Sequence, residues 1–200
     1  MKPDPTSPTR RNLLTAGLAM PALLLPGLRV AWSQAAELPV TPMCGEDPTP
    51  RDYEGPFFKP RSPMRTSLLD PGVTGAKLVL SGYVMSKSCK PLAGAVLDFW
   101  HCDTAGRYDN AGYRLRGHQF TDEAGRYRLE TIFPGEYPGR TRHIHVKVQA
   151  KHGPLLTTQL YFPNNPANEN DFLFKPALLM MLTEADAGKM GRFDFVLDVA

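Results

Sequence analysis

The sequence predicts an all-β protein in the form of a β-sandwich. Short strand-like runs follow one another from residue 77 to the C-terminus. Glycine, proline and aspartate cluster between the runs, as they do in tight turns. Long stretches with helical periodicity are lacking. Regular short strands with such turns are typical of sandwiches.

The expected strands cover most of the chain after a proline-rich segment. They are residues 77–84, 95–102, 117–121, 126–132, 142–150, 155–162 and 192–199. The turn sequences K-P, D-T-A-G, D-E-A-G and F-P-G begin at residues 90, 103, 122 and 133. One stretch, residues 175–182, is compatible with a short helix. We expect long loops between the strands of this sandwich.

The N-terminus has the three parts of an export signal. Arg10 and Arg11 precede an apolar run at residues 13–28, and small residues follow at 33–36. Paired arginines are typical of the twin-arginine route, which places a folded protein in the periplasm or outside the cell. A membrane anchor is the alternative, but prolines 21 and 26 break a run that is already short. We therefore expect a signal peptide at 1–35, a proline-rich arm at 36–76 and a catalytic sandwich at 77–200.

The predicted signal also carries the excess of positive charge. The chain has 23 Lys and Arg against 20 Asp and Glu, and residues 1–35 hold four basic residues and one acidic residue. The remainder is balanced at 19 of each, with no basic face for a nucleic acid. Its cysteines are Cys44, Cys89 and Cys102. An oxidising compartment favours one disulfide and one free thiol, with the pairing left open.

The stretch PGEYPGRTRHIHVKV, residues 134–148, contains the strongest chemical signal. Alternate residues of a strand point to opposite faces, so His143 and His145 lie side by side on the face opposite Ile144, Val146 and Val148. Two imidazoles at this spacing can hold one ion, although histidines are also common on exposed strands. The stretch alone does not choose between a metal site and a half-exposed strand.

Two tyrosines add to this signal. Tyr137 lies in the Pro-Gly turn before the histidines, and Tyr108 lies in the loop after the strand at 95–102. Zinc prefers His, Cys and carboxylates. A phenolate is a hard anionic donor that suits a trivalent ion such as Fe(III). The sandwich pattern by itself is also similar to transthyretin-like secreted binding modules, in which the turn tyrosine is a packing residue.

The region from about residue 49 to 199 resembles the intradiol ring-cleaving dioxygenases, the catechol and protocatechuate dioxygenase family, and most of all their short exported members. The resemblance rests on TPRDYEGPFF, PLAGAVLDFWHCDTAGRY, TDEAGRYRLETIFPGEYPGR, RHIHVKV and LLTTQLYF, in the order of the family. Thr141 stands where larger members usually have proline. The resemblance implies a non-haem Fe(III) enzyme that cleaves an aromatic 1,2-diol with O2 to a cis,cis-muconate-type diacid.

The family's functional residues can be carried over to positions in this sequence. The resemblance implies Tyr108, Tyr137, His143 and His145 as the Fe(III) ligands, with Tyr137 as the ligand that leaves when substrate binds. Arg140 would stabilise charge on the substrate ring, and the family's catalytic glutamine in the strand after the histidines would be Gln159. Two other interpretations remain: a non-catalytic binding module, and a copper or zinc enzyme built on His143, His145 and another histidine. The particular diol and the oligomeric state stay open.

The remaining histidines, tyrosines and the cysteine near the predicted ligand loop are expected to have structural roles. His101 is expected to be a satisfied structural histidine, and His118 and His152 are expected to be solvated. Core or rim positions are expected for Tyr113, Tyr127 and Tyr161, and Cys102 is expected to be buried or disulfide-bonded.

Overall fold

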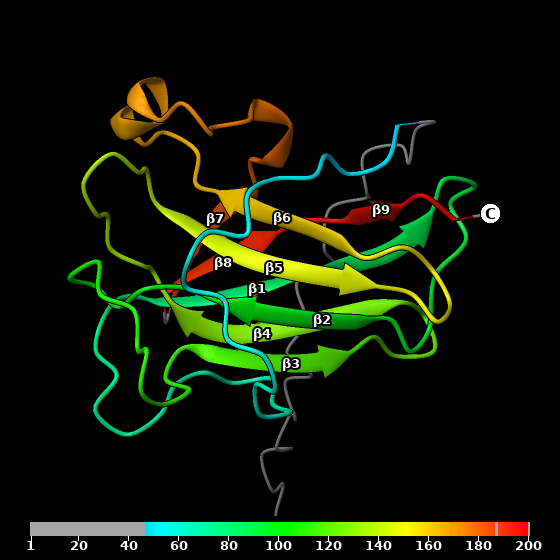
Figure 1. Cartoon of the computed structure of the whole chain (residues 1–200), viewed down its shortest axis with the longest axis horizontal. Helices are drawn as coiled ribbons and strands as arrows, with labels where there is room; N and C mark the ends of the chain where they lie inside the picture. Colours follow the sequence, from blue (N-terminus) through cyan, green and yellow to red (C-terminus); the bar gives the residue numbers. More distant parts are fainter. Residues whose placement is uncertain (1–46, 187, 200) are drawn as a thin grey trace, which may run out of the picture. The chain divides into compact units, whose positions relative to one another are not determined.

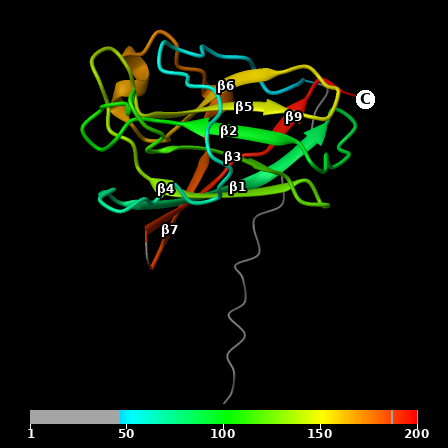
Figure 2. The ribbon, with the colours of Figure 1, turned by 60° about the horizontal axis from the view of Figure 1, so that its bottom comes forward.

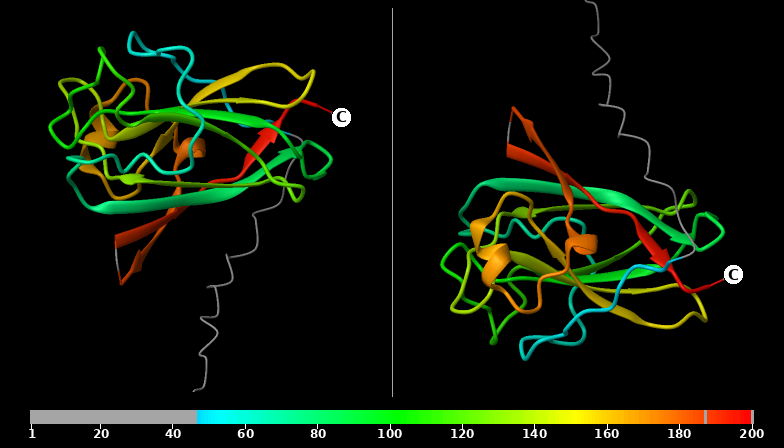
Figure 3. Two further views of the ribbon diagram at one scale, coloured as in Figure 1. Left: turned by 90° about the horizontal axis from the view of Figure 1, so that it is seen from below. Right: turned by 90° about the horizontal axis from the view of Figure 1, so that it is seen from above.

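The computed structural model describes residues 47–186 and 188–199. This part of the chain forms two β-sheets that lie face to face, with two short 3-10 segments (Figure 1). The predicted export signal and Cys44 lie outside the described residues. The layered arrangement is visible when the molecule is turned about the horizontal axis (Figures 2 and 3). The predicted all-β sandwich is confirmed.

One sheet has the order β4-β1-β8-β7, with β9 also paired to β1, and the other has the order β3-β2-β5-β6. The strands are β1 Lys77–Ser86, β2 Val96–Trp100, β3 Arg116–Phe120, β4 Arg126–Ile132, β5 His143–Gln149, β6 Leu156–Tyr161, β7 Met181–Ala185, β8 Gly188–Arg192 and β9 Phe195–Leu197. Each predicted strand overlaps an observed strand. The strand predicted at residues 192–199 is observed mainly as β9, which has only three residues. The 3-10 segments are η1 Pro166–Asn170 and η2 Pro176–Leu178.

The turns form for the local reasons that the sequence indicates. The Asp122 carboxylate accepts hydrogen bonds from the backbone N–H groups of Ala124 and Arg126 at 2.9 and 2.8 Å. Gly125 adopts a φ of 72°, which glycine tolerates best. Asp103 holds the D-T-A-G loop in the same way, through the N–H groups of Ala105 and Arg107 at 2.9 Å each. Aspartate side chains therefore close both turns.

The hydrophobic core lies between the sheets and is made by alternate residues of the strands. Ile144, Val146 and Val148 of β5 are fully buried, and the core also contains residues from other strands of both sheets. Among these are Leu78, Leu80, Leu97, Phe99, Leu129 and Leu160. His143, His145 and Lys147 therefore lie on the outer face of the second sheet, as the alternation predicts.

Residues 47–58 of the predicted arm run across this outer face (Figure 1). Backbone hydrogen bonds join Thr49 to Val196 and Asp52 to Thr157. Further along, the ring of Phe58 lies edge-on to Trp100, with centroids 4.9 Å apart. The outer face is therefore covered rather than exposed, and the arm is part of the surroundings of the two histidines.

Two local expectations are wrong, and one hairpin was not expected. Residues 175–182 do not form a helix, because a three-residue 3-10 turn at Pro176 leads directly into β7. The hairpin of β7 and β8 was not predicted, because its residues show no clear alternation of apolar and polar side chains. His118 is not a solvated loop residue: it lies in β3, half-buried, and its Nδ1 lies 2.7 Å from the Ser62 carbonyl.

The two cysteines within the described range have different states. Cys89 takes part in a disulfide, whereas Cys102 is a buried free thiol. This agrees with the expectation of a disulfide together with one free cysteine. Among the helices in the described range, none is long and apolar enough to cross a membrane.

Candidate metal centre

The site begins with two imidazoles that converge on the outer face of β5. The Nε2 atoms of His143 and His145 lie 3.1 Å apart, and both residues are buried, with 2% and 1% exposure. Trp100 is directly opposite His145 in the neighbouring strand, and the two rings stack with centroids 4.9 Å apart and planes 3° apart. From the arm, Gly55 lies against the edge of the His145 ring. The strand sets the spacing of the two imidazoles, and packing against Trp100 and Gly55 fixes the orientation of the His145 ring.

Both histidines are in the neutral form that a metal requires. Burial, together with the nearby charge of Arg140, lowers the pKa of His143 to about 4. Burial also places the pKa of His145 well below its ordinary value. Nδ1 of His143 lies 2.6 Å from the Thr141 carbonyl, which can only accept, so the proton of this ring is on Nδ1. Its Nε2 therefore presents a lone pair to the site.

Tyr108 reaches the histidines from the loop after β2. Its hydroxyl lies 3.4 Å from Nε2 of His143. Phe57 of the arm stacks on the Tyr108 ring, with centroids 4.3 Å apart and planes 15° apart. The buried guanidinium of Arg116 lies 5.9 Å from the same ring and donates to the Phe57 carbonyl at 2.6 Å. These contacts orient the phenol toward the imidazoles.

Tyr137 reaches the same point from the Pro-Gly turn before β5. Its hydroxyl is also 3.4 Å from Nε2 of His143. The turn and the Tyr108 loop approach backbone to backbone: the N–H of Gly135 donates to the Asp103 carbonyl at 2.8 Å. A Cβ on Gly135 would lie 2.5 Å from the Thr104 carbonyl oxygen. Glycine at this position lets the two tyrosine-bearing loops meet.

The structure thus brings together the four residues that the sequence predicts as ligands. The three distances that join their donor atoms are 3.1, 3.4 and 3.4 Å. Donor atoms that bind one first-row metal at about 2 Å each lie roughly 3 Å apart. Burial raises the pKa of both tyrosines, so each phenol stays protonated unless a strong cation is beside it. Two phenols and two neutral imidazoles fit a hard trivalent ion.

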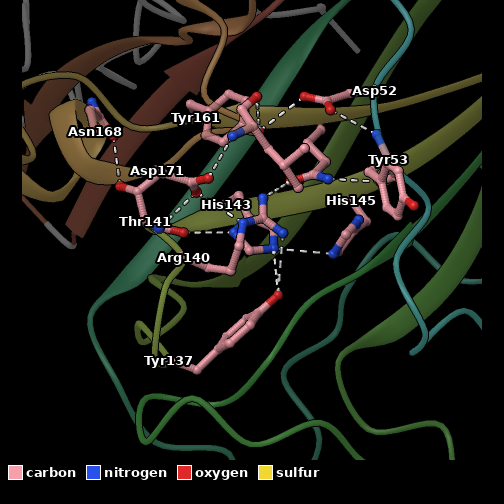
Figure 4. Close-up of polar contacts among 12 residues, drawn as sticks. Asp52, Tyr53, Tyr137, Arg140, Thr141, His143, His145, Tyr161, Asn168 and Asp171 are labelled. Carbon is pink, nitrogen blue, oxygen red and sulfur yellow. Dashed lines mark hydrogen bonds and ion pairs between the residues drawn. The ribbon is translucent and has the colours of Figure 1, made fainter.

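Arg140 lies beside Tyr137 and His143 (Figure 4), and Gln159 is its hydrogen-bond partner. Nη1 of Arg140 donates to the Tyr137 hydroxyl at 3.4 Å, and Nη2 donates to Oε1 of Gln159 at 2.5 Å. Gln159 is opposite His145 in β6, and its amide donates to the Tyr53 carbonyl at 2.7 Å. The structure therefore places a fixed cation and an amide next to the candidate ligands.

Sequence reasoning missed several residues that support the site. Asp171 forms an ion pair with Arg140 at 2.9 Å. Asp52 accepts a hydrogen bond from Tyr161 at 2.9 Å, and Tyr161 lies 3.3 Å from Gln159. Phe57 belongs to a predicted motif, but its stacking on Tyr108 has no signal in the sequence. Their partners are far apart along the chain, so no local spacing could reveal them.

The other candidates lie outside the group. His101 is buried and fully bonded, with its two ring nitrogens 2.8 Å from the Cys102 carbonyl and 2.6 Å from the Thr131 hydroxyl. His152 is exposed, as expected. Tyr127 and Tyr161 are core residues, and Tyr113 is a half-buried rim residue. Over the described ranges, no three His, Cys, Asp or Glu side chains are grouped to hold a metal, so the tyrosines are needed to complete a site.

A family model described as dioxygenase matches residues 53–199, which is most of the chain. Catechol and chlorocatechol 1,2-dioxygenases are among the similar proteins. The chain belongs to the intradiol ring-cleavage dioxygenase family. The matched range includes every residue of the candidate centre and the arm segment from Tyr53 onward.

Other proteins similar to this member of the family extend the comparison. Catechol 1,2-dioxygenase of Acinetobacter baylyi is 30% identical over 158 residues, which are 64% of this chain and 51% of the relative. The dioxygenase domain of a dioxygenase carbohydrate-binding protein fusion from Streptomyces sp. SirexAA-E is 60% identical, with a TM-score of 0.75 over 77% of this chain and 100% of that domain. The 3-chlorocatechol 1,2-dioxygenase of Rhodococcus opacus 1CP is 30% identical, with a TM-score of 0.69 over 76% of this chain and 74% of that one. The chain spans about half the length of the first curated relatives that it matches. The family uses non-haem iron.

Proposed function

We propose that this protein is a non-haem Fe(III) dioxygenase that cleaves an aromatic 1,2-diol between its two hydroxyl-bearing carbons. O2 is the second substrate, and both of its atoms enter the product, a cis,cis-muconate-type diacid. One observation carries the proposal: the hydroxyls of Tyr108 and Tyr137 converge on Nε2 of His143, beside His145. The substrate class is supported by the catechol 1,2-dioxygenases among its relatives.

The four converging residues would hold the iron, with no other ligand from the described chain. Fe(III) held there would supply a Lewis acid that binds both oxygens of a diol. The neutral imidazoles of His143 and His145 add no charge, so the two phenolates would offset most of the charge of the ion. Hard anionic oxygen donors favour iron over copper or zinc at this site.

Tyr137 is suited to receive a proton from the diol. Its hydroxyl lies 3.4 Å from Nε2 of His143 and 3.4 Å from Nη1 of Arg140, so these two hydrogen bonds are weak and the oxygen can take a new partner. Nη1 of Arg140 lies next to that oxygen. It can stabilise negative charge on the phenolate and then on the substrate. Tyr108, in contrast, is held by the Phe57 stack and is suited to remain in place.

Arg140 is suited to stabilise negative charge on the ring as it reacts with O2. Its pKa is raised even though burial opposes this, because Asp171 and Tyr137 favour the charged form. A fixed cation aimed at developing charge is a strong contribution in a site from which water is excluded. Gln159 keeps the guanidinium in one orientation through the 2.5 Å hydrogen bond.

Residues 1–35 are proposed to direct export by the twin-arginine route, to the periplasm or outside the cell. The support is the Arg10-Arg11 pair before the apolar run. That route carries folded proteins, which agrees with a metal that is loaded before export.

Metal analysis, visible spectroscopy and oxygen uptake with a panel of catechols test the proposed enzyme. We expect one Fe(III) per chain, a tyrosinate-to-iron charge-transfer band in the visible range, and equal consumption of diol and O2. Tyr108→Phe should weaken or shift the band. Tyr113→Phe is the matched control, because the Tyr113 hydroxyl donates to the Pro60 carbonyl outside the group. Stoichiometric zinc or copper without the band, or iron protein that consumes no O2 with any diol, would contradict the proposal.

A further inference from the structure

Asp171 is the most completely buried carboxylate beside the candidate centre. It follows η1 directly in the sequence and lies 31 residues from Arg140, and its side chain is only 1% exposed. Oδ2 accepts a hydrogen bond from Nε of Arg140 at 2.9 Å, and Oδ1 accepts one from the backbone N–H of Leu173 at 2.9 Å. The carboxylate is therefore anchored to its own loop and to the arginine at the same time (Figure 4).

Asp171 holds the backbone next to Arg140 as well as its side chain. Oδ2 also accepts from the N–H of Thr141 at 2.9 Å, a bond that residue 141 can donate because it is not proline. One carboxylate oxygen thus fixes the side chain of Arg140 and the backbone of its neighbour. Such a clamp restricts both the rotamer of Arg140 and the entry of the chain into β5.

The loop that carries Asp171 is itself braced against the same backbone. The Thr141 hydroxyl donates to Oδ1 of Asn168 at 2.6 Å, and the Asn168 amide donates to the Phe162 carbonyl at 2.9 Å. Asn165 caps η1 by accepting from the N–H of Ala167. The segment from the end of β6 to Leu173 is thereby joined to Thr141 at two points.

The ion pair with Asp171 also determines which partners the other two nitrogens of Arg140 reach. With Nε on Asp171, the planar guanidinium directs Nη1 to the Tyr137 hydroxyl and Nη2 to Gln159. A buried guanidinium without a counter-charge is strongly unfavourable and would turn toward solvent or another acceptor. Gln159, a neutral partner, does not replace that charge.

We propose that Asp171 is the positioning residue that holds Arg140 against the candidate metal centre, and that η1 and its flanking loop serve to place this carboxylate. The inference rests on the proposed function for its catalytic consequence. Asp171 itself does not touch substrate or metal in this scheme. Its effect on catalysis is exerted through Arg140, and its bond to the Thr141 N–H steadies the backbone beside that arginine.

Kinetics of Asp171→Asn give the first test. The amide keeps the size of the side chain but removes the charge. We expect kcat to fall about ten- to a hundred-fold with unchanged iron content, less than the roughly hundred- to thousand-fold cost of removing a charge stabiliser itself. KM should change by less than about threefold, because in this scheme Arg140 acts on the ring as it reacts rather than in binding the diol. In an Arg140→Ala background, Asp171→Asn should lower kcat by less than about twofold further.

Asp194→Asn is the matched control. Asp194 forms an equally short ion pair with Arg192, at 2.9 Å, and the two side chains are 7% and 5% exposed. Loss of the Asp194–Arg192 ion pair should lower the free energy of unfolding about as much as loss of the Asp171–Arg140 pair. It should leave kcat within about twofold of wild type. A loss of kcat as large in Asp194→Asn as in Asp171→Asn, or an unchanged kcat in Asp171→Asn, would overturn the inference.

A second measurement does not depend on turnover. In protein loaded with diamagnetic Ga(III) and labelled with ¹⁵N-arginine, the Nε–H signal of Arg140 can be assigned from its absence in Arg140→Ala. We expect this proton to be protected from exchange in wild type and Asp194→Asn, and unprotected in Asp171→Asn. Protection that survives in Asp171→Asn contradicts the inference. Iron-loaded wild type that oxidises no diol contradicts the proposed function instead, and the exchange result still decides the role of Asp171.

Discussion

Gly106 packs directly against the main-chain carbonyl of Glu136. A Cβ on Gly106 would lie 2.3 Å from that oxygen, and the φ of Gly106 is 75°. The contact joins the loop that carries Tyr108 to the turn that carries Tyr137. The relative position of the two phenols thus depends on a glycine that is not itself part of the centre.

Gly106→Ala should therefore separate the two tyrosines. The added methyl meets backbone, which cannot move aside as a flexible side chain would, so the loops must shift. We expect a loss of unfolding free energy of about 1–3 kcal/mol together with reduced iron content and a weaker visible band. Thermal unfolding and metal analysis measure the two effects.

Gly72→Ala separates backbone strain from this clash. Gly72 has a similar φ of 83°, but a Cβ there would meet nothing within 4 Å. The Gly72→Ala variant should lose about 1 kcal/mol of unfolding free energy through backbone strain alone, and it should keep its iron. Equal iron loss in both variants would show that the Gly106–Glu136 contact does not set the geometry.

The buried thiol of Cys102 predicts a pH dependence of stability. Burial raises its pKa from 9.0 to about 11, and its Sγ lies 3.4 Å from the Gly135 carbonyl. The folded state therefore favours the protonated thiol. This contribution is fully present below pH 9 and is lost as pH rises from about 9 to 11, because the unfolded chain releases the proton first.

Denaturant unfolding of wild type and Cys102→Ala across this range measures the effect. Wild type should lose about 2–3 kcal/mol more than Cys102→Ala between pH 8 and pH 11. The tyrosines with raised pKa titrate in both proteins, so most of their effect cancels in the difference. Parallel curves for the two proteins would show that Cys102 does not contribute.

Sequence periodicity accounts for much of the site, since strand alternation alone places His143 and His145 on one face. It also predicts that face to be opposite the core, which the structure confirms. The arm that buries this face could not be inferred, because Gly55 and Phe57 lie in an irregular segment without periodicity. Asp171 could not be inferred either, since only the folding of η1 brings it to Arg140. The hairpin of β7 and β8 was missed because M-L-T-E-A and G-K-M-G-R carry neither alternation nor β-branched enrichment.

Export should depend on the paired arginines at the N-terminus. Replacing Arg10 and Arg11 together with lysine keeps the charge but removes the twin-arginine feature. We expect the precursor to stay inside the cell at full length, whereas wild type loses about 35 residues. Fractionation with mass spectrometry of the mature N-terminus checks this. Replacing Arg29 with lysine is the control, and unchanged export of the double variant would exclude the twin-arginine route.

The last prediction concerns the three different nitrogens of Arg140. Nε, Nη1 and Nη2 contact Asp171, Tyr137 and Gln159 respectively, so the planar fork is used in full. Arg140→Lys keeps a positive charge but offers a single nitrogen, which cannot reach all three partners. Lysine should therefore restore only part of the activity that Arg140→Ala loses.

Stopped-flow mixing with a diol and then with O2 separates binding from oxygen reaction. In Arg140→Ala we expect iron to be retained, diol binding to be altered little, and the oxygen reaction to slow about a hundred- to a thousand-fold, because charge on the ring loses its fixed cation. Arg140→Lys should fall between this variant and wild type. Arg128→Ala removes an exposed arginine paired with Glu130 and should leave both steps unchanged. If Arg140→Ala loses its iron, Arg140 acts in holding the centre together. If the variant keeps its iron and reacts with O2 at the wild-type rate, Arg140 takes no part in the oxygen reaction.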